Sequence, residues 1–313
     1  MMGTASLEFA PGGLPSAHAV LERSHGENFP VASRLLAPAD RRHLLAIYGF
    51  ARLADELGDE LHGDRLAALD WLAGELDRAY AGEAGHPLLL RLRQTLAECP
   101  LPREAFIRLI DANRLDQTAW RYETWGQLEA YCELSANPVG ELVLCVFKLA
   151  TPERIELSRL VCTGLQLTEH LQDLAEDVNR GRFYLPVEDL ARFGGSHEQL
   201  SLLLSAGGHG LDLGGVPSGT TPRSEDFLRS AARTREAISF ETARARVLLA
   251  AGVPLVAGVR GRPKLALAGF LAGGQAALDA IERADFDVLG GAPRVRRERL
   301  LWRLAGVLMK ARA

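Results

Sequence analysis

The sequence predicts an all-α protein, and three observations support this fold class. Apolar residues recur at three- and four-residue spacing along most of the 313 residues. Aromatic residues make up only 6% of the chain, which favours helices over sheet. No segment shows the apolar–polar alternation of a half-buried strand, and no fixed-period repeat is visible. We therefore expect a bundle of amphipathic helices.

The expected helices follow one another between turn residues. The first covers 41–61 and lacks Pro, and the second covers 66–80 and ends before the turn Gly85–Pro87. The same spacing predicts further helices over 103–115, 125–149, 152–179, 224–251, 262–284 and 296–311. The stretch 205–222 is rich in Gly, Ser and Thr and predicts a flexible surface loop. Whether that loop acts as a lid is left open.

Composition excludes several classes of protein. Apolar residues make up 47% and charged residues 24%, which excludes a largely disordered chain. The 36 Lys and Arg against 40 Asp and Glu give a net charge of −4. Since a nucleic-acid binder usually shows a basic excess, we expect no nucleic-acid partner. The length allows two ordinary domains or one large one.

The cysteines and the apolar stretches indicate the compartment. The four cysteines lie far apart without a CxxC pair, so we expect neither a zinc site nor a disulfide framework. The first fifteen residues do not resemble a signal peptide. The best candidate span, 247–259, is shorter than the about 20 residues needed and contains Gly252 and Pro254. We expect a soluble, cytoplasmic protein.

Two acidic pairs carry the chemical content of the sequence. Asp55 and Asp59 are four residues apart, with Tyr48 and Arg52 on the same predicted helix face. Asp173 and Asp177 repeat the spacing, and Gln166 and Glu169 extend their polar stripe along a helix with Leu on its other faces. A single acidic pair usually marks a solvated helix face. Two pairs on apolar-flanked helices also fit carboxylate ligands for Mg²⁺, which would in turn hold a diphosphate.

These residues lie within motifs that resemble the squalene/phytoene synthase family. The run Asp55–Asp59, preceded by Tyr48 and Arg52, is similar to the family's first aspartate-rich motif. The run 166–186 (QLTEHLQDLAEDVNRGRFYLP) is similar to the second motif with its tail. The resemblance extends from about residue 18 to 289 and implies a class I isoprenoid (terpenoid) synthase fold, a single-domain helical bundle over 1–313 with a central cavity. The two acidic clusters would then face each other across that bundle.

Three flanking stretches resemble the bacterial hopanoid branch of the family, namely 27–36, 135–140 and 187–194. That branch implies ionisation and rearrangement of presqualene diphosphate with a water quench to hydroxysqualene. It implies two or three Mg²⁺ ions and no NADPH. Functional coupling to a presqualene diphosphate synthase and peripheral contact with the inner face of the cytoplasmic membrane are further expectations. The sequence does not identify the membrane-contacting helix or the oligomeric state.

The resemblance also implies a set of site residues. Asp55, Asp59, Asp173 and Asp177 would be the Mg²⁺ ligands, and Arg52 and Arg182 would contact the diphosphate. Further substrate contacts would come from His25, Asn28, Phe29, Tyr48, Tyr131, Gln166 and Tyr184. An apolar pocket wall is expected at Val139, Leu142, Val143 and Val146. Each of these side chains also has an ordinary structural interpretation, such as a core tyrosine with a satisfied hydroxyl.

Two positions depart from the family pattern. Glu169 stands where Asn is common, and it would be a further Mg²⁺ ligand or orient the quenching water. Gln172 stands where Arg is common and removes a cation from the diphosphate site. Two other functions remain open. One is presqualene diphosphate or phytoene synthase, which joins two prenyl diphosphates. The other is a non-catalytic helical binding factor of the same fold.

Overall fold

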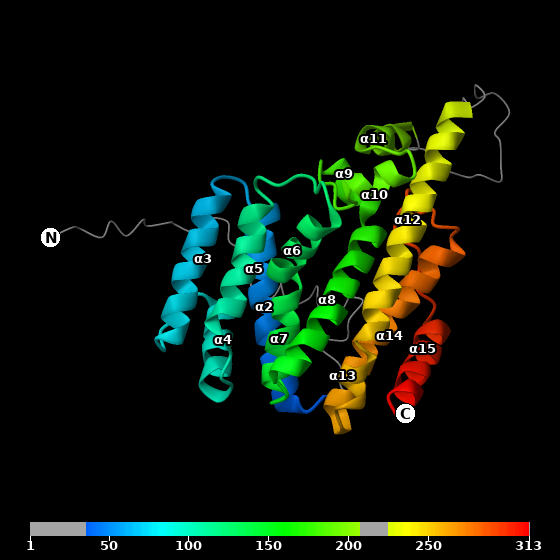
Figure 1. Cartoon of the computed structure of the whole chain (residues 1–313). Helices are drawn as coiled ribbons and strands as arrows, with labels where there is room; N and C mark the ends of the chain where they lie inside the picture. The colour runs from blue at the N-terminus through cyan, green and yellow to red at the C-terminus, as the bar shows by residue number, and fades with distance from the viewer. Residues whose placement is uncertain (1–35, 207–224, 313) are drawn as a thin grey trace. The chain divides into compact units, whose positions relative to one another are not determined.

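The all-α prediction is confirmed. The computed structural model describes residues 36–206 and 225–312, which form helices joined by short connections (Figure 1). Within these ranges the one β feature is an isolated bridge between Arg121 and Phe183. The predicted loop over 205–222 lies outside the described ranges from residue 207 onward. The chain divides into two compact units, and the single-domain organisation stays a prediction.

The first unit contains the described residues up to Thr118 together with Pro138–Ala150. Helix α2 contacts three others, α3, α4 and α5, and its Phe50 ring meets Phe106 of α5 edge-on at 4.9 Å. Burial of the apolar face of α2 and these contacts hold its polar face in a fixed direction. The bounds are α2 (Pro38–Asp59), α3 (Arg65–Tyr80), α4 (Pro87–Glu98), α5 (Arg103–Leu115) and most of α7 (Asn137–Val146).

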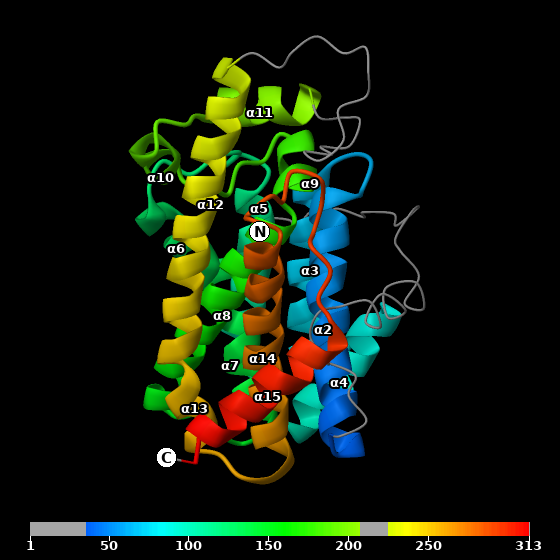
Figure 2. The same cartoon turned by 90° about the vertical axis from the view of Figure 1, so that its right-hand side faces the viewer.

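The second unit contains Ala119–Asn137 and the described residues from Thr151 onward. Helix α8 packs along α12 and also contacts α14, α6 and α9, and α15 lies on α14 (Figures 1 and 2). The central position of α8 fixes the direction of its polar stripe. The bounds are α6 (Trp125–Ser135), α8 (Pro152–Gln172), α9 (Leu174–Asn179), α10 (Val187–Arg192), α11 (His197–Ala206), α12 (Glu225–Ala251), α13 (Val253–Ala257), α14 (Gly261–Arg283) and α15 (Arg297–Lys310).

Two predicted helices are divided in the structure. The helix expected over 125–149 is interrupted at Ala136, because Pro138 has no N–H to continue the hydrogen-bond ladder. The helix expected over 152–179 is interrupted at Asp173, whose backbone (φ −94°, ψ 7°) leaves the helical region. Asp is a weak helix former, and Asp173, Glu176 and Asp177 repel one another within about one turn. Helices α4, α10, α11 and α13 were not predicted.

The sequence prediction also overlooked the apolar length of α14. By length and composition, this is the one helix in 36–206 and 225–312 that could cross a membrane. About two thirds of its apolar window is buried against the rest of the chain. The four cysteines are free in the structure.

Candidate functional site

The first acidic cluster, Asp55 and Asp59, lies on α2, and both side chains are partly buried. Helix α5 supports it from the side. The Asn113 amide donates to Asp55 Oδ1 at 3.2 Å, and the Gln117 amide donates to the Gly58 carbonyl at 3.0 Å. A neutral amide partner orients the carboxylate without neutralising it. The charge of Asp55 is therefore still available to a cation.

Charges around the first acidic cluster favour an ionic ligand. Burial raises the pKa of Asp55 to about 6, although the Asn113 hydrogen bond and the Arg52 charge both act to lower it. Within the described residues Arg52 makes two long ion pairs, 3.9 Å from its Nε to Glu56 and 3.8 Å from its Nη2 to Glu60. Its Nε is buried and has no hydrogen-bond partner within the described residues. Arg52 places a positive charge beside Asp55, which suits a site that binds a cation together with an anionic group.

Gly58 permits the close approach of α2 and α5 at this point. A Cβ at Gly58 would overlap Oδ1 of Asn113 and lie 3.1 Å from the Asn113 Cβ. Asn113 could then keep neither its place nor its hydrogen bond to Asp55. The short distance between the helices is thus part of how the first acidic cluster is oriented.

Gly58→Ala is therefore expected to lower the free energy of unfolding by about 1–3 kcal/mol, the usual cost of overpacking. Urea unfolding measures the change. The matched control is Gly74→Ala on α3, where nothing lies within 4 Å of an added Cβ. This control is expected to gain up to about 1 kcal/mol from helix propensity. Equal stability of Gly58→Ala and the wild type would contradict the packing argument.

The second acidic cluster, Glu169, Asp173 and Asp177, lies where α8 passes into α9. Backbone hydrogen bonds link the three positions in series, from Asp173 N to Glu169 O at 2.8 Å and from Asp177 N to Asp173 O at 2.9 Å. The spacing of a continuous helix therefore persists across the interruption. Partial desolvation raises the pKa of Asp173, and the negative charges of Asp177 and Glu176 raise it further. A cation at this position would relieve that repulsion.

A turn after α9 returns the chain toward Asp177. Gly181 has φ +78°, a conformation that glycine adopts without strain. This turn lets Arg182 N donate to Asp177 O at 2.8 Å. Arg182, predicted to contact diphosphate, therefore follows the second acidic cluster directly.

An aromatic cluster adjoins the second acidic cluster. Tyr184 stacks on His170 with ring centroids 3.8 Å apart, and it lies 5.5 Å from Tyr131 and 5.8 Å from Tyr122. His170 Nδ1 is 3.9 Å from Asp177 Oδ2, and its Nε2 is 3.3 Å from the Gln166 amide. The structure thus brings together the predicted residues Tyr131, Gln166 and Tyr184. Sequence reasoning missed His170 and Tyr122, although His170 lies inside the second motif.

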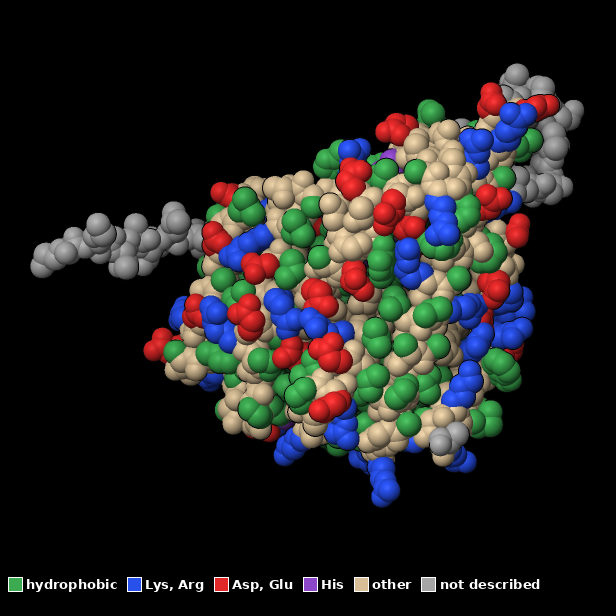
Figure 3. Space-filling model, in the orientation of Figure 1, with side chains coloured by type: hydrophobic (Ala, Val, Ile, Leu, Met, Phe, Trp, Pro, Cys, Tyr) green, Lys and Arg blue, Asp and Glu red, His purple; other side chains and the backbone are tan. Residues whose placement is uncertain are grey.

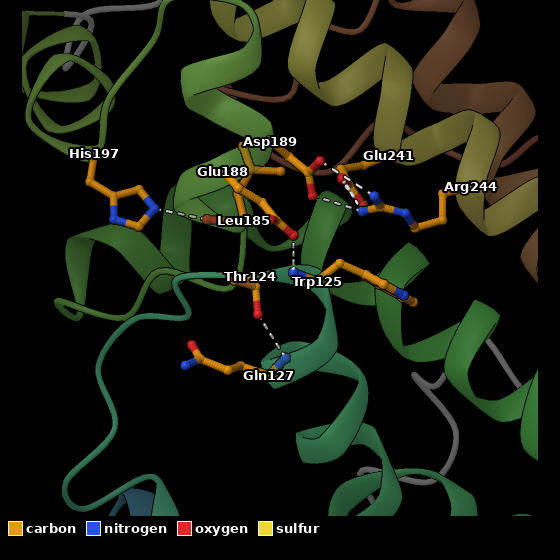
Figure 4. Close-up of polar contacts among 9 residues, drawn as sticks. All are labelled: Thr124, Trp125, Gln127, Leu185, Glu188, Asp189, His197, Glu241 and Arg244. Carbon is orange, nitrogen blue, oxygen red and sulfur yellow. Dashed lines mark hydrogen bonds and ion pairs between the residues drawn. The ribbon is translucent and has the colours of Figure 1, made fainter.

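The chain segment that carries Tyr184 is held by an anchoring network (Figure 4). Main-chain hydrogen bonds run from Phe183 N to Trp120 O and from Val187 N to Tyr122 O. His197 Nε2 is 2.8 Å from the Leu185 carbonyl, and Glu188 accepts from Trp125 N at 2.6 Å. These contacts fix the tail of the second motif against the start of α6.

At the far side of this network one guanidinium faces two buried carboxyl groups. Arg244 of α12 donates to Asp189 at 2.8 Å and to Glu241 at 2.5 Å, as Figure 4 shows. It also lies over the Trp125 ring at 4.4 Å and the Phe240 ring at 4.8 Å. Burial, followed by a hydrogen bond with Asp189, raises the pKa of Glu241 to about 8. The protonated form of Glu241 is therefore favoured near neutral pH.

The donor set fits Mg²⁺. In 36–206 and 225–312 no three acidic, His or Cys side chains converge into a complete metal cage. Mg²⁺ does not require one, because it is usually bound by one or two carboxylates, water and substrate phosphates. Paired aspartates, with an arginine near each pair, match that mode of binding.

Other predicted site residues have different outcomes. His25, Asn28 and Phe29 lie outside the described residues. Tyr48 is partly buried on α2, and the α7 residues Leu142, Val143 and Val146 are buried. Gln172 is buried, whereas Glu169 of the second acidic cluster is partly exposed. The roles assigned to all of these residues stay predictions.

Comparisons with known proteins agree with this description. The family model described as squalene/phytoene synthase matches residues 22–209. A hydroxysqualene synthase from Rhodopseudomonas palustris is 40% identical over 184 residues, which cover 58% of this chain and 62% of the relative. A presqualene diphosphate synthase from Zymomonas mobilis is 33% identical over 183 residues, covering 57% of this chain and 62% of the relative. The matches thus span less than two thirds of these curated relatives.

Two solved structures extend the likeness over more of the chain. Squalene synthase HpnC from Alicyclobacillus acidocaldarius is 40% identical with a TM-score of 0.72, covering 85% of this chain and 92% of that one. A dehydrosqualene synthase is 20% identical with a TM-score of 0.73, covering 94% of each chain, and supports the fold alone. The class I isoprenoid synthase fold predicted from the sequence is confirmed. The chain belongs to the squalene/phytoene synthase family.

Proposed function

We propose that this chain is a Mg²⁺-dependent hydroxysqualene synthase, which converts presqualene diphosphate and water to hydroxysqualene and diphosphate. The observation that carries the proposal is the second acidic cluster with aromatic rings directly beside it. Carboxylates suit a metal-bound leaving group, and aromatic faces suit the cation that it leaves behind. Relatives named hydroxysqualene synthase, at 37–40% identity, support this branch over others in the family.

In this proposal Asp55, Asp59, Asp173 and Asp177 hold the Mg²⁺–diphosphate group. Bound Mg²⁺ would neutralise the charge that develops on the departing diphosphate. Arg52 and Arg182 bind the same group through charge-assisted hydrogen bonds. Breaking the C–O bond leaves its electron pair on diphosphate and a cyclopropylcarbinyl cation on the hydrocarbon.

In the same proposal, other residues stabilise the carbocation and control its reaction with water. Tyr122, Tyr131 and Tyr184 form an aromatic cluster beside the second acidic cluster, and aromatic rings suit the stabilisation of a nearby positive charge. The buried apolar side chains of α7 would exclude bulk water. Glu169, in the second acidic cluster, orients the water that ends the reaction. The cyclopropylcarbinyl cation rearranges, and the oxygen of water then adds to the rearranged cation as its ring bond breaks. Loss of one proton from the added water gives hydroxysqualene without a reductant.

Product analysis tests the function. Purified protein is supplied with presqualene diphosphate and Mg²⁺, without NADPH, and the products are identified by mass spectrometry. Hydroxysqualene is expected, and omission of Mg²⁺ is expected to abolish its formation. Squalene, phytoene or unreacted substrate would contradict the proposal.

Assays with other prenyl substrates distinguish the two alternative functions, a condensing enzyme and a non-catalytic binding factor. Incubation with farnesyl or geranylgeranyl diphosphate yields presqualene diphosphate or phytoene if the chain is a condensing enzyme, as the presqualene diphosphate synthase relative is named. A non-catalytic binding factor releases no diphosphate from any prenyl substrate, with or without Mg²⁺.

A further inference from the structure

Helix α15 is fixed to the second unit through one face. Val307 and Ala311 are buried on this side, and Lys264 of α14 donates to the Ala311 carbonyl at 3.2 Å. Arg303 makes a two-pronged contact with Asp279 of α14, with Nε–Oδ2 at 2.7 Å and Nη2–Oδ1 at 2.5 Å. Asp279 is nearly buried, so this pair is shielded from solvent. The rotation of α15 about its own axis is therefore set.

The opposite face of α15 is apolar and exposed. Leu301, Trp302 and Met309 are 65%, 63% and 65% exposed, and Ala305 lies between them at helical spacing. In Figure 2 α15 crosses in front of α14. We call these four residues the α15 stripe. Scattered exposed apolar residues are ordinary, but large ones aligned on a single helix face mark an interaction surface.

The charges beside the α15 stripe are almost all positive. From residue 294 to 312 the single acidic residue is Glu298. Six basic residues of this described stretch are not paired with α14, namely Arg294, Arg296, Arg297, Arg299, Lys310 and Arg312, whereas Arg303 is paired with Asp279. The whole chain carries a net charge of −4, so positive charge is concentrated here. In Figure 3 blue side chains gather along the right-hand margin, where α12, α14 and α15 lie in Figure 1.

Charge complementarity selects the occupant of this surface. A second copy docking stripe to stripe would place arginines against arginines, which disfavours a symmetric dimer. An anionic lipid surface satisfies both features at once. Basic side chains meet the headgroups, and Trp and aliphatic side chains enter the boundary with the acyl chains. Trp is also the residue type enriched at that depth of a membrane.

We propose that α15 is a membrane-contacting helix that lies in the plane of an anionic bilayer surface, with the α15 stripe inserted and its basic flanks on the headgroups. This mode differs from a membrane span, because the inner face of α15 stays packed on α14. The inference rests on the exposed face and the charges, and it does not depend on which prenyl diphosphate the protein uses.

Vesicle flotation of the full chain tests the proposal without any substrate. Vesicles of phosphatidylcholine containing about one third phosphatidylglycerol are compared with pure phosphatidylcholine vesicles. The wild type is expected to float with the anionic vesicles and much less with the neutral ones, and raising the salt concentration is expected to weaken binding.

Variants separate the contribution of the apolar side chains to membrane binding from that of the basic side chains. Leu301→Ser/Trp302→Ser/Met309→Ser is expected to weaken binding by about tenfold or more, since the inserted apolar area is lost. Arg297→Gln and Arg299→Gln are each expected to weaken it about fivefold. The matched control, Leu66→Ser/Leu202→Ser/Leu228→Ser, alters three leucines that are 49%, 67% and 50% exposed on α3, α11 and α12. The control is expected to bind as the wild type does.

Trp302 supplies a second readout. Its fluorescence emission is expected to shift to shorter wavelength on adding anionic vesicles, and Trp302→Phe should remove that shift. Binding that the α15 triple variant leaves unchanged would overturn the proposal. So would a concentration-dependent dimer that this variant abolishes while the wild type fails to float. Neither result affects the product assay, so the membrane proposal and the proposed function can be refuted independently of each other.

Discussion

Asp173→Asn is expected to lower the turnover of presqualene diphosphate by about a hundredfold to a thousandfold, with no loss of folding stability. The amide keeps the shape of the carboxylate but removes the charge that would hold Mg²⁺. Desolvation and the neighbouring carboxylates of Asp177 and Glu176 already raise the pKa of Asp173, so its charged form is disfavoured without a cation. Removing that charge therefore relieves repulsion in the protein alone. Asp55→Asn is expected to behave alike, because its oxygen can still accept from Asn113.

Two measurements on each variant are needed to check this expectation. Turnover is followed by diphosphate release, and stability by thermal unfolding with and without Mg²⁺ and diphosphate. The stabilisation that these ligands give the wild type should be reduced in both variants, which reports binding apart from activity. Asp70→Asn on α3 is the control, because Asp70 lies outside both acidic clusters and is paired with Arg114. Wild-type rates in Asp55→Asn or Asp173→Asn would refute the assignment of these aspartates.

Arg244→Met is expected to destabilise the second unit by about 3–5 kcal/mol. The substitution keeps an apolar stem over Trp125 and Phe240 but leaves Asp189 and Glu241 without their shared cation. Asp189 and Glu241 are 6% and 0% exposed, so solvent does not compensate for the loss. Chemical denaturation measures the change. Arg229→Met on the same helix is the control, because its pair with Glu225 is exposed and contributes less than about 1 kcal/mol.

The pH dependence provides an independent check on the same cluster. The pKa of Glu241 is about 8 in the folded protein, against 4.5 as its ordinary value, so the folded state retains a proton that the unfolded state releases. This contribution to stability is complete below pH 4.5 and is lost as the pH rises through about 8. Glu241→Gln should therefore be more stable than the wild type at pH 9, and this advantage should shrink toward pH 5. A gap that does not vary with pH would show that Glu241 is ionised in the fold.

The predicted helices and the two acidic clusters could be found from the sequence, because both depend on local spacing. The bounds of α5 match the prediction at both ends, and those of α3 differ by one residue. Helix α4 was missed because its Pro87 was interpreted as part of a turn, whereas proline is well suited to a first helical turn. The aromatic cluster could not be predicted from spacing, since Tyr122 and Tyr184 are far apart in sequence and meet through main-chain pairing.

The pairing of 120–123 with 183–188 has a consequence for sequence drift in this protein. The hydrogen bonds from Phe183, Val187 and Glu188 to Trp120, Tyr122 and Glu123 use backbone groups at both ends. Any residue except proline supplies such a donor, so the backbone pairing does not depend on the side chains at these positions, although the Glu188 side chain adds its own bond to Trp125 N. The backbone pairing then keeps Tyr122 and Tyr184 close enough to stack, whatever side chains the donor positions carry. Neighbouring positions are left free to diversify the wall around the rings without moving the rings themselves.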